Sequence, residues 1–249
     1  MSSIKDKVVV ITGASSGMGA ATAKLANKEG AKVVIGSRNH DKLSKIASEV
    51  DNPDNLVYQI TDVEQVSDVQ ALVKLALDTF GRLDVMYNNA GIMPQGAVED
   101  VKKLPEWQAI LNTNIMGVLN GIAAAVPVMK KQGKGLIMAT DSVAGHVVYP
   151  YSAVYNGSKY AVRAIMEGLR QEQHNNGIKT GIVSPGAVST NLFSTVHDDK
   201  IEKQMLSANE TKNGSLTPEN IAELAVFMMS QPENVDINEI MVRPTGQNI

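Results

Sequence analysis

The sequence predicts a single doubly wound α/β domain over residues 1–249, with helices on both faces of a parallel sheet of about seven strands. Short β-rich runs alternate with helical patterns along almost the whole chain. The run at Val8–Thr12 (VVVIT) is apolar on both faces, which is typical of a strand in a parallel sheet covered on each side. No linker-like stretch divides the 249 residues, a length that suits one large domain.

The strand and helix signals follow one another in order. Strands are predicted at Lys7–Ile11, Lys32–Gly36, Leu56–Ile60, Leu83–Tyr87, Leu136–Ala139, Thr180–Val183 and Ile237–Val242. A glycine turn follows the first strand and opens a helix that runs to about Glu29, where Gly30 closes it. Helices are also predicted over 151–175 and from Thr217-Pro218-Glu219, which combines an N-cap, a proline and an acid in the first turn.

Two segments depart from this rhythm. Residues 111–129 are apolar around most of a helix circumference, so we expect this helix to be covered on more than one side, with a second subunit as one candidate. Residues 187–215 are polar and long for a loop. This pattern predicts a loop that covers the substrate, and the alternative is a plain surface segment.

Composition excludes several functions. The formal net charge of −3 gives no electrostatic reason to expect nucleic acid or an anionic membrane as partner. The chain has no cysteine, and its four histidines are scattered, so no metal site is expected. We see no signal peptide, and the apolar stretch at 121–129 is too short to span a bilayer and contains Pro127. These features favour a cytoplasmic protein.

The glycine turn is the first candidate binding element. It has the spacing G-x-x-x-G-x-G at Gly13, Gly17 and Gly19, between a strand and a helix. Glycines in this position let the backbone approach a pyrophosphate, and a helix N-terminus presents free N–H groups. The alternative is a tight turn without a ligand.

The end of the second strand bears on the choice of cofactor. An NAD site usually has an acid here, but this chain has Ser37, Arg38 and Asn39. A guanidinium matches the oxygens of a 2′-phosphate, and a serine could add a donor, which favours NADP over NAD. The alternative is that Arg38 is an ordinary surface arginine.

Tyr155 and Lys159 form the strongest candidate for chemistry. Their i,i+4 spacing places both on one face of the predicted helix, and no other tyrosine has a Lys or Arg four residues on. An adjacent ammonium should lower the pKa of the phenol, so that Tyr155 could give and take a proton near neutral pH. Ser142 lies thirteen residues upstream, past a predicted strand end.

These pieces, in this order, resemble the short-chain dehydrogenase/reductase family over nearly the whole chain, and its bacterial NADP-dependent branch in particular. The resemblance implies a Rossmann-like domain in which Tyr155 is the general acid/base, Lys159 lowers its pKa, and Ser142 binds the substrate oxygen. It further implies that Asn114 anchors a water in a proton relay. The implied cofactor contacts are Gly13, Ser15, Ser16, Gly17, Met18, Gly19, Ser37, Arg38, Asn39, Asp62, Val63, Asn89, Ala90, Gly91, Tyr155, Lys159, Pro185, Gly186, Val188 and Thr190.

Most of these residues also have simpler interpretations. Ser142 could only make a turn, and Asn88-Asn89 could close a strand. Asp62 with Gln65 predicts a helix N-cap with its capping-box partner, whether or not it also contacts adenine. Asn114 is harder to explain without a function, because a buried amide needs partners.

Residues near the tyrosine are candidates for the substrate pocket. Tyr149 and Tyr151 could line it or belong to a subunit interface, and Met93 could face substrate or fill the core. Asp141 replaces a serine that many members of the family have beside the catalytic one, and its effect is left open.

The sequence therefore predicts an NADP(H)-dependent oxidoreductase that interconverts an alcohol and a ketone or aldehyde. The alternatives are an NAD-dependent alcohol dehydrogenase of the same family and a non-catalytic dinucleotide sensor. The apolar helix at 111–129, the Tyr155 helix and the resemblance together predict a homotetramer, or a homodimer.

Overall fold

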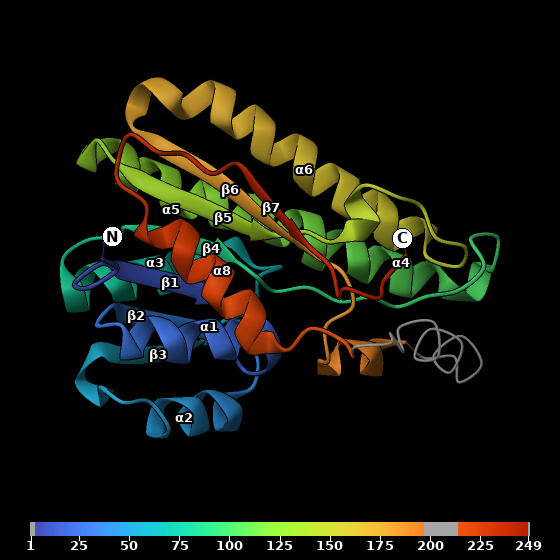
Figure 1. Ribbon diagram of the computed structural model, residues 1–249, viewed down its shortest axis with the longest axis horizontal. Coiled ribbons are helices and arrows are strands. Elements are labelled where there is room, and N and C mark those ends of the chain that lie inside the picture. Colours follow the sequence, from blue (N-terminus) through green and yellow to red (C-terminus); the bar gives the residue numbers. More distant parts are fainter. Residues whose placement is uncertain (1–2, 197–213, 249) are drawn as a thin grey trace.

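All strands of the described chain belong to one parallel sheet. The computed structural model describes residues 3–196 and 214–248, and its sheet has the order β3-β2-β1-β4-β5-β6-β7 (Figure 1). The strands are β1 Val8–Thr12, β2 Lys32–Ser37, β3 Leu56–Ile60, β4 Val85–Asn88, β5 Gly135–Thr140, β6 Ile178–Pro185 and β7 Glu239–Val242. The predicted fold class is confirmed, and every predicted strand overlaps an observed one.

Helices cover both faces of this sheet. On one face lie α1 Gly17–Lys28, α2 His40–Ser48 and α8 Pro218–Ser230, and on the other α3 Val66–Phe80, α5 Gly117–Gln132 and α6 Ala153–Gln173 (Figure 1). Two separate core clusters follow from the alternation of side chains along a strand, since Val9 and Ile11 of β1 pack on the first face and Val8 and Val10 on the second. A doubly wound sheet of this kind gathers its strand ends into a single binding edge.

Helix ends follow the predicted signals with one exception. Gly30 has φ +86°, and Thr217 begins α8 with a capping box completed by Asn220. The prediction that Asp62 caps a helix is wrong. Its carboxylate accepts from the Glu64 N–H (3.1 Å) in a local turn. The helix α3 begins only at Val66, with Gln65 as its N-cap residue, so Asp62 lies before the cap position.

The apolar segment at 111–129 contains a change of helix type. The helix α4 (Leu104–Ile110) continues into a π-helical segment at Leu111–Met116 and then into α5. By length and composition alone Val101–Gln132 could cross a membrane, although half of its most apolar stretch is buried inside the protein. The core helix of a globular protein passes the same test, and α5 packs against α3 and strands β4 and β5.

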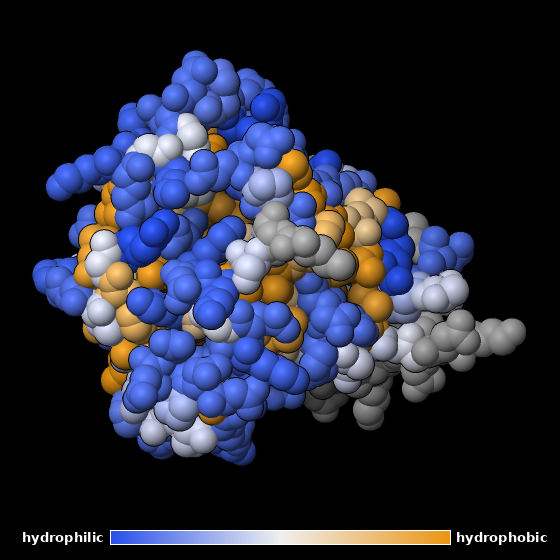
Figure 2. All heavy atoms as spheres, turned by 60° about the vertical axis from the view of Figure 1, so that its left-hand side comes forward, coloured by the Kyte–Doolittle hydropathy of each residue, from blue (hydrophilic) through white to orange (hydrophobic). Residues whose placement is uncertain are grey.

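Only the ends of the predicted substrate loop at 187–215 are described. Val188 forms a β-bridge with Leu216, and a short 3₁₀ helix spans Asn191–Thr195. Residues 197–213 lie outside the described residues. Figure 2 shows a face of the molecule that is mostly hydrophilic, with hydrophobic side chains visible in several places between the polar ones.

Candidate active site

The glycine turn packs tightly against the end of β4. Gly13 has φ +65°, and a Cβ there would lie 2.6 Å from Ala90 Cα. A Cβ on Gly19 would lie 2.6 Å from the Gly13 carbonyl oxygen. No side chain larger than hydrogen fits at either position, and the N-cap residue Ser16 makes no side-chain bond to the first turn of α1. The turn therefore offers a bare backbone and uncapped N–H groups, which suit a phosphate group.

Three polar side chains tie the ends of β1, β4 and β5 together below this turn. Asn89 donates from Nδ2 to the carbonyl oxygens of Thr12 (3.1 Å) and Gly13 (3.2 Å). Thr140 donates to Asn89 Oδ1 at 3.1 Å, and Thr12 Oγ1 accepts from the N–H groups of Asn89 and Ala90. Asn89 thus does more than close a strand. Thr12 and Thr140 were not predicted as site residues, because their role depends on which strand ends are neighbours in the sheet.

The end of β2 presents the residues predicted to select the cofactor. Ser37 is buried and its Oγ accepts from the Asn39 N–H (3.3 Å), while Asn39 Oδ1 accepts from the Lys42 N–H (2.9 Å) and so caps α2. Arg38 is exposed. Asp62 and Val63 follow the neighbouring strand β3, whose end is joined to β2 by the Thr61 N–H and the Ser37 carbonyl (2.9 Å).

Tyr155, Ser142 and Lys159 come together at the end of β5. The Tyr155 side chain is only 6% exposed, and the Ser142 side chain is close enough to lower the pKa of its phenol. Ser142 begins a short 3₁₀ turn, Val143–Gly145, and its Oγ accepts from the Ala144 N–H at 3.1 Å. Lys159 Nζ lies 5.6 Å from the Tyr155 ring centroid and donates to the Thr140 carbonyl at 2.7 Å.

The expectation of a lowered tyrosine pKa is wrong for this arrangement. Burial raises the pKa of Tyr155 above its ordinary value, the Ser142 hydrogen bond lowers it less, and the Asp141 carboxylate raises it further. The Lys159 ammonium is directed at a backbone carbonyl rather than at the phenol oxygen. Burial also lowers the pKa of Lys159, against the opposing effect of Asp141. Tyr155 is therefore held in its protonated form.

Asn114 lies within the π-helical segment, and both the oxygen and the nitrogen of its side-chain amide are hydrogen-bonded. Oδ1 accepts from the Ile92 N–H at 2.9 Å, and Nδ2 donates to the Ile92 carbonyl (3.0 Å) and to Ser158 Oγ (3.1 Å). A Cβ on Gly91 would lie 3.4 Å from Asn114 Oδ1 and 4.0 Å from Lys159 Nζ. Asn114 thus fixes the irregular segment that follows β4 beside Lys159.

The segment after β6 closes over the glycine turn. Pro185 ends β6, and a Cβ on Gly186 would lie 2.9 Å from the side-chain carbon Cδ of Gln247. A Cβ on Gly17 would lie 3.4 Å from Thr190 Cγ2, so Thr190 faces the turn directly. The structure therefore brings the predicted segments around Gly13–Gly19, Asn89–Gly91 and Pro185–Thr190 to one place.

An apolar cluster adjoins the tyrosine on its other side. Its buried members are Met93, Ala144, Tyr155 and Val196, with Tyr149 and Leu192 packed against them. Tyr149 is thus placed beside the candidate acid/base, whereas Tyr151 is half-exposed and has φ +61°. Leu192 and Val196 were not predicted individually, and their only signal was their apolar character within the polar segment 187–215.

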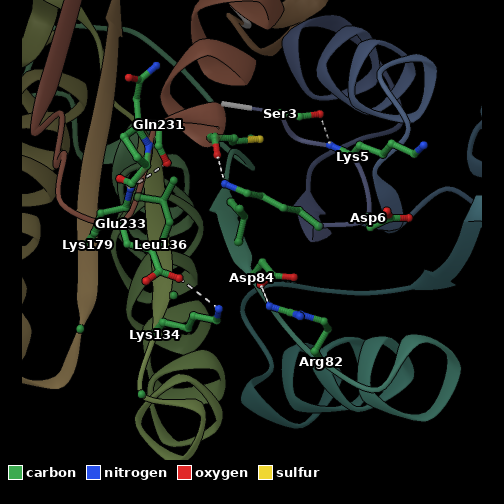
Figure 3. A pocket seen from close by; sticks show the side chains of 17 residues that line it. Ser3, Lys5, Asp6, Arg82, Asp84, Lys134, Leu136, Lys179, Gln231 and Glu233 are labelled. Atoms are coloured by element: carbon green, nitrogen blue, oxygen red, sulfur yellow. Dashed lines mark hydrogen bonds and ion pairs between the residues drawn. The ribbon is translucent and has the colours of Figure 1, made fainter. Parts of the chain in front are cut away.

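A separate hollow of about 570 Å³ lies at the opposite, amino-terminal edge of the sheet (Figure 3). Three of the four lysines that line it are bonded to other groups of the protein. Lys7 Nζ donates to the Met229 carbonyl (2.6 Å), Lys179 Nζ donates to three carbonyls near the end of α8, and Lys134 pairs with Glu233 (3.1 Å). These cations stabilise the C-terminal end of α8, and none of the predicted site residues lines the hollow.

Comparison with known proteins identifies the family. The sequence profile of the short chain dehydrogenase family matches residues 7–201. The chain belongs to the short-chain dehydrogenase/reductase family. It is 46% identical over 251 residues to an uncharacterized oxidoreductase of Staphylococcus saprophyticus, covering 100% of both chains.

Solved structures of this family share the fold. An alcohol dehydrogenase from the archaeon Thermococcus sibiricus, complexed with 5-hydroxy-NADP, has 28% identity and a TM-score of 0.84, covering 98% of this chain and 99% of that one. A 3-ketoacyl-(acyl-carrier-protein) reductase from Brucella melitensis, complexed with NADH, has 29% identity and a TM-score of 0.86, with coverages of 96% and 98%. The chain is accordingly an oxidoreductase with the fold of nicotinamide-dinucleotide-binding enzymes.

Proposed function

We propose that the protein is a single-domain, cytoplasmic NADP(H)-dependent oxidoreductase that interconverts an alcohol and a ketone or aldehyde. The observation that carries the proposal is the meeting of Ser142, Tyr155, Lys159 and Asn114 at one strand end, beside a glycine turn that can take a phosphate. The bare Gly13–Gly19 backbone and the uncapped first turn of α1 fit a dinucleotide pyrophosphate.

The protein's own groups would handle the proton and the charge. The nicotinamide cofactor would supply the hydride. Tyr155, held protonated by burial, would donate its proton to the carbonyl oxygen during reduction, and Ser142 would donate a hydrogen bond to the same oxygen. The Lys159 ammonium, 5.6 Å from the ring, would stabilise the phenolate that remains. Alcohol oxidation needs the phenolate at the start, so its rate should rise with pH.

The preference for NADP is proposed from the end of β2. Arg38 is exposed there, Ser37 and Asn39 flank it, and no acid stands at this position. The solved relatives do not decide the matter, because one is complexed with 5-hydroxy-NADP and another with NADH. The chemistry of a guanidinium favours the 2′-phosphate.

We further propose that the protein assembles as a homotetramer, with a homodimer as the smaller alternative. Leu111 and Met116 of the π-helical segment and Tyr160 of α6 are 39%, 46% and 39% exposed although they are large and apolar. Apolar side chains of this size on adjacent helices are typical of a surface that is covered by a second subunit.

The test is NADPH oxidation with a panel of ketones and aldehydes. Tyr155→Phe should reduce kcat by roughly 10²–10⁴-fold, because the general acid is lost while the ring is kept. Tyr58→Phe, in β3 and outside the site, is the matched control and should leave kcat unchanged. If Tyr155→Phe turned over at the wild-type rate, the mechanism would be wrong. If NADPH bound but no carbonyl compound oxidised it, a non-catalytic sensor would replace the enzyme.

A further inference from the structure

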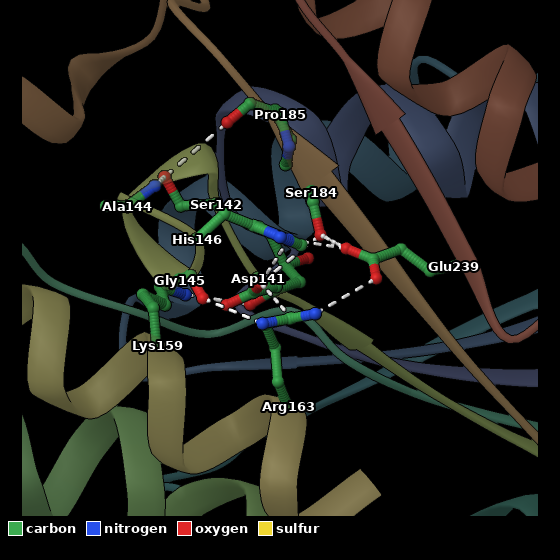
Figure 4. Close-up of polar contacts among 11 residues, drawn as sticks. Asp141, Ser142, Ala144, Gly145, His146, Lys159, Arg163, Ser184, Pro185 and Glu239 are labelled. Carbon is green, nitrogen blue, oxygen red and sulfur yellow. Dashed lines mark hydrogen bonds and ion pairs between the residues drawn. The ribbon is translucent and has the colours of Figure 1, made fainter. Parts of the chain in front are cut away.

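Asp141, which directly precedes Ser142, is buried and lies in a cluster of polar and charged side chains in which His146, Arg163 and Glu239 are partly exposed (Figure 4). Ser184 Oγ is within hydrogen-bonding distance of Asp141 Oδ2 (3.2 Å) and of Glu239 Oε1 (2.8 Å). His146 Nε2 lies 2.5 Å from Glu239 Oε1 and 3.7 Å from Asp141 Oδ2. Arg163 lies 4.0 Å from Asp141 and 3.6 Å from Glu239. The end of β5, the turn after it, α6, β6 and β7 thus meet in one polar cluster.

This cluster could be a metal site or an internal ion-pair network. Ligand atoms of Asp141, His146 and Glu239 all lie within 4.8 Å of one another, and buried Asp141 Oδ1 makes no hydrogen bond to the described residues. The Arg163 guanidinium, however, already approaches both carboxylates and would repel a cation placed between them. The charges therefore favour an ion-pair network.

The network holds both ends of the catalytic serine turn. At the start, the Asp141 N–H donates to the Val183 carbonyl (2.8 Å), and Ser184 Oγ lies 3.2 Å from Asp141 Oδ2. At the end, Arg163 Nη1 donates to the Gly145 carbonyl (3.1 Å), and the His146 side chain is held by Glu239. A Cβ on Gly145 would lie 2.5 Å from Asp141 Oδ2, so the turn is folded directly onto the carboxylate. The position of Ser142 Oγ toward Tyr155 follows from these contacts.

The same carboxylate acts on the reacting groups through its charge. Asp141 raises the pKa of Tyr155 and the pKa of Lys159. Burial raises the pKa of Asp141 itself to about 6, opposed by Lys159, the Ser142 N–H, Ser184 and His146. The titratable and charged groups that face it are Tyr155, Lys159 and Arg163 of α6, His146 of the turn and Glu239 of β7.

We propose that Asp141 is a positioning residue: hydrogen-bonded to Ser184 and lying close to His146 and Arg163, it fixes the turn that carries Ser142. This role rests on the proposed function for its kinetic consequences. The fixing of the turn is independent of it.

The deciding variant is Asp141→Asn, which keeps the shape and removes the charge. Without the negative charge, which raises the pKa of Tyr155, the fall in the rate of carbonyl reduction at high pH should move to lower pH. We expect kcat to fall by about 10- to 100-fold because Ser142 is less well placed. The Kd for NADPH should stay within about twofold, since the glycine turn is untouched. Glu239→Gln should give a smaller loss of kcat, and Glu167→Gln, exposed on α6, is the neutral control.

A second readout does not need a substrate. Hydrogen exchange measured by mass spectrometry should become faster in the peptide covering 142–149 in Asp141→Asn, with the rest of the sheet unchanged. This result would support the positioning role even if the wild-type protein turned over no carbonyl compound, an outcome that would reject the proposed function alone. A wild-type pH profile together with wild-type exchange in Asp141→Asn would overturn the inference. So would EDTA-sensitive activity that Glu239→Gln abolishes, since that would make the cluster a metal site.

Discussion

Arg38 is the side chain on which the choice between NADP and NAD should depend. It follows β2, next to buried Ser37, whose oxygen is already bonded to the Asn39 N–H. Asn39 is occupied in capping α2. Of the three residues, only Arg38 is a cation that could bind a phosphate with two parallel hydrogen bonds.

Arg38→Ala should lower the ratio of kcat/KM for NADPH to that for NADH by about 10- to 100-fold, the effect of losing one charged hydrogen-bonding pair. Activity with NADH should change little. The measurement is initial rates with both cofactors, and Lys42→Ala removes a cation from the same surface as a control. An unchanged ratio would show that Arg38 does not contact the 2′-phosphate.

The residues of the candidate site could be found from the sequence, but the protonation of the tyrosine could not. Spacing and order predict that Ser142, Tyr155 and Lys159 lie together, and they do. The direction of the Tyr155 pKa shift depends on burial and on Lys159 bonding the Thr140 carbonyl, neither of which a spacing of four residues reveals. The surroundings of Asp141 likewise depend on Glu239, almost one hundred residues away.

At the scale of helices and strands, close packing depends on glycines that look alike in the sequence. Gly121 lies where α5 approaches β4, and a Cβ there would lie 2.7 Å from Asn88 Cγ and 3.0 Å from Met86 Cε. Gly168 lies inside α6, and a Cβ there would meet nothing within 4 Å. Substitution by alanine should therefore lower the free energy of unfolding at Gly121 and raise it at Gly168.

Gly121→Ala should lower the free energy of unfolding by about 1–3 kcal/mol, because a methyl group is forced into a packed contact. Gly168→Ala should raise it by about 0.5–1 kcal/mol, since alanine is the better helix former. Urea denaturation followed by circular dichroism measures both. A stabilised Gly121→Ala would mean that α5 can move away from the sheet at little cost.

Strands and regular helices could be predicted because their apolar patterns are local. The π-helical segment at Leu111–Met116 could not, since the amide of Asn114 within it bonds to Ile92 and Ser158, which are distant in the sequence. The predicted cap at Asp62 failed for a related reason. An Asx turn and an N-cap use the same side-chain oxygen as acceptor, and the sequence does not show which backbone N–H will donate to it.

At the scale of the whole molecule, the doubly wound sheet explains why residues from 12 to 190 meet. The order β3-β2-β1-β4-β5-β6-β7 reverses direction between β1 and β4, and a crevice forms at such a reversal. Thr12, Asn89 and Thr140, from three neighbouring strands, bond to each other there. The alternation of strands and helices was sufficient to predict this architecture, but not the number of copies that assemble.

Light scattering should give a mass four times that of the 26.6 kDa chain. Met116→Lys should lower that mass, because a charge would enter the proposed apolar interface. Val66→Lys, at an exposed apolar position on α3, is the control and should not change it. A stable monomer for the wild-type protein would contradict the proposed assembly.

The π-helical segment has a consequence for how this protein can change. A π turn accommodates one residue more than an α turn, so the long helix carries what amounts to a single-residue insertion at Leu111–Met116. Removing one residue there would restore regular α-helical winding and leave α4 and α5 free to continue their packing, while Asn114 would rotate away from Ile92. The shortened protein should then still fold but lose turnover, and the loss would come from the length of the chain rather than from the chemistry of a substituted side chain.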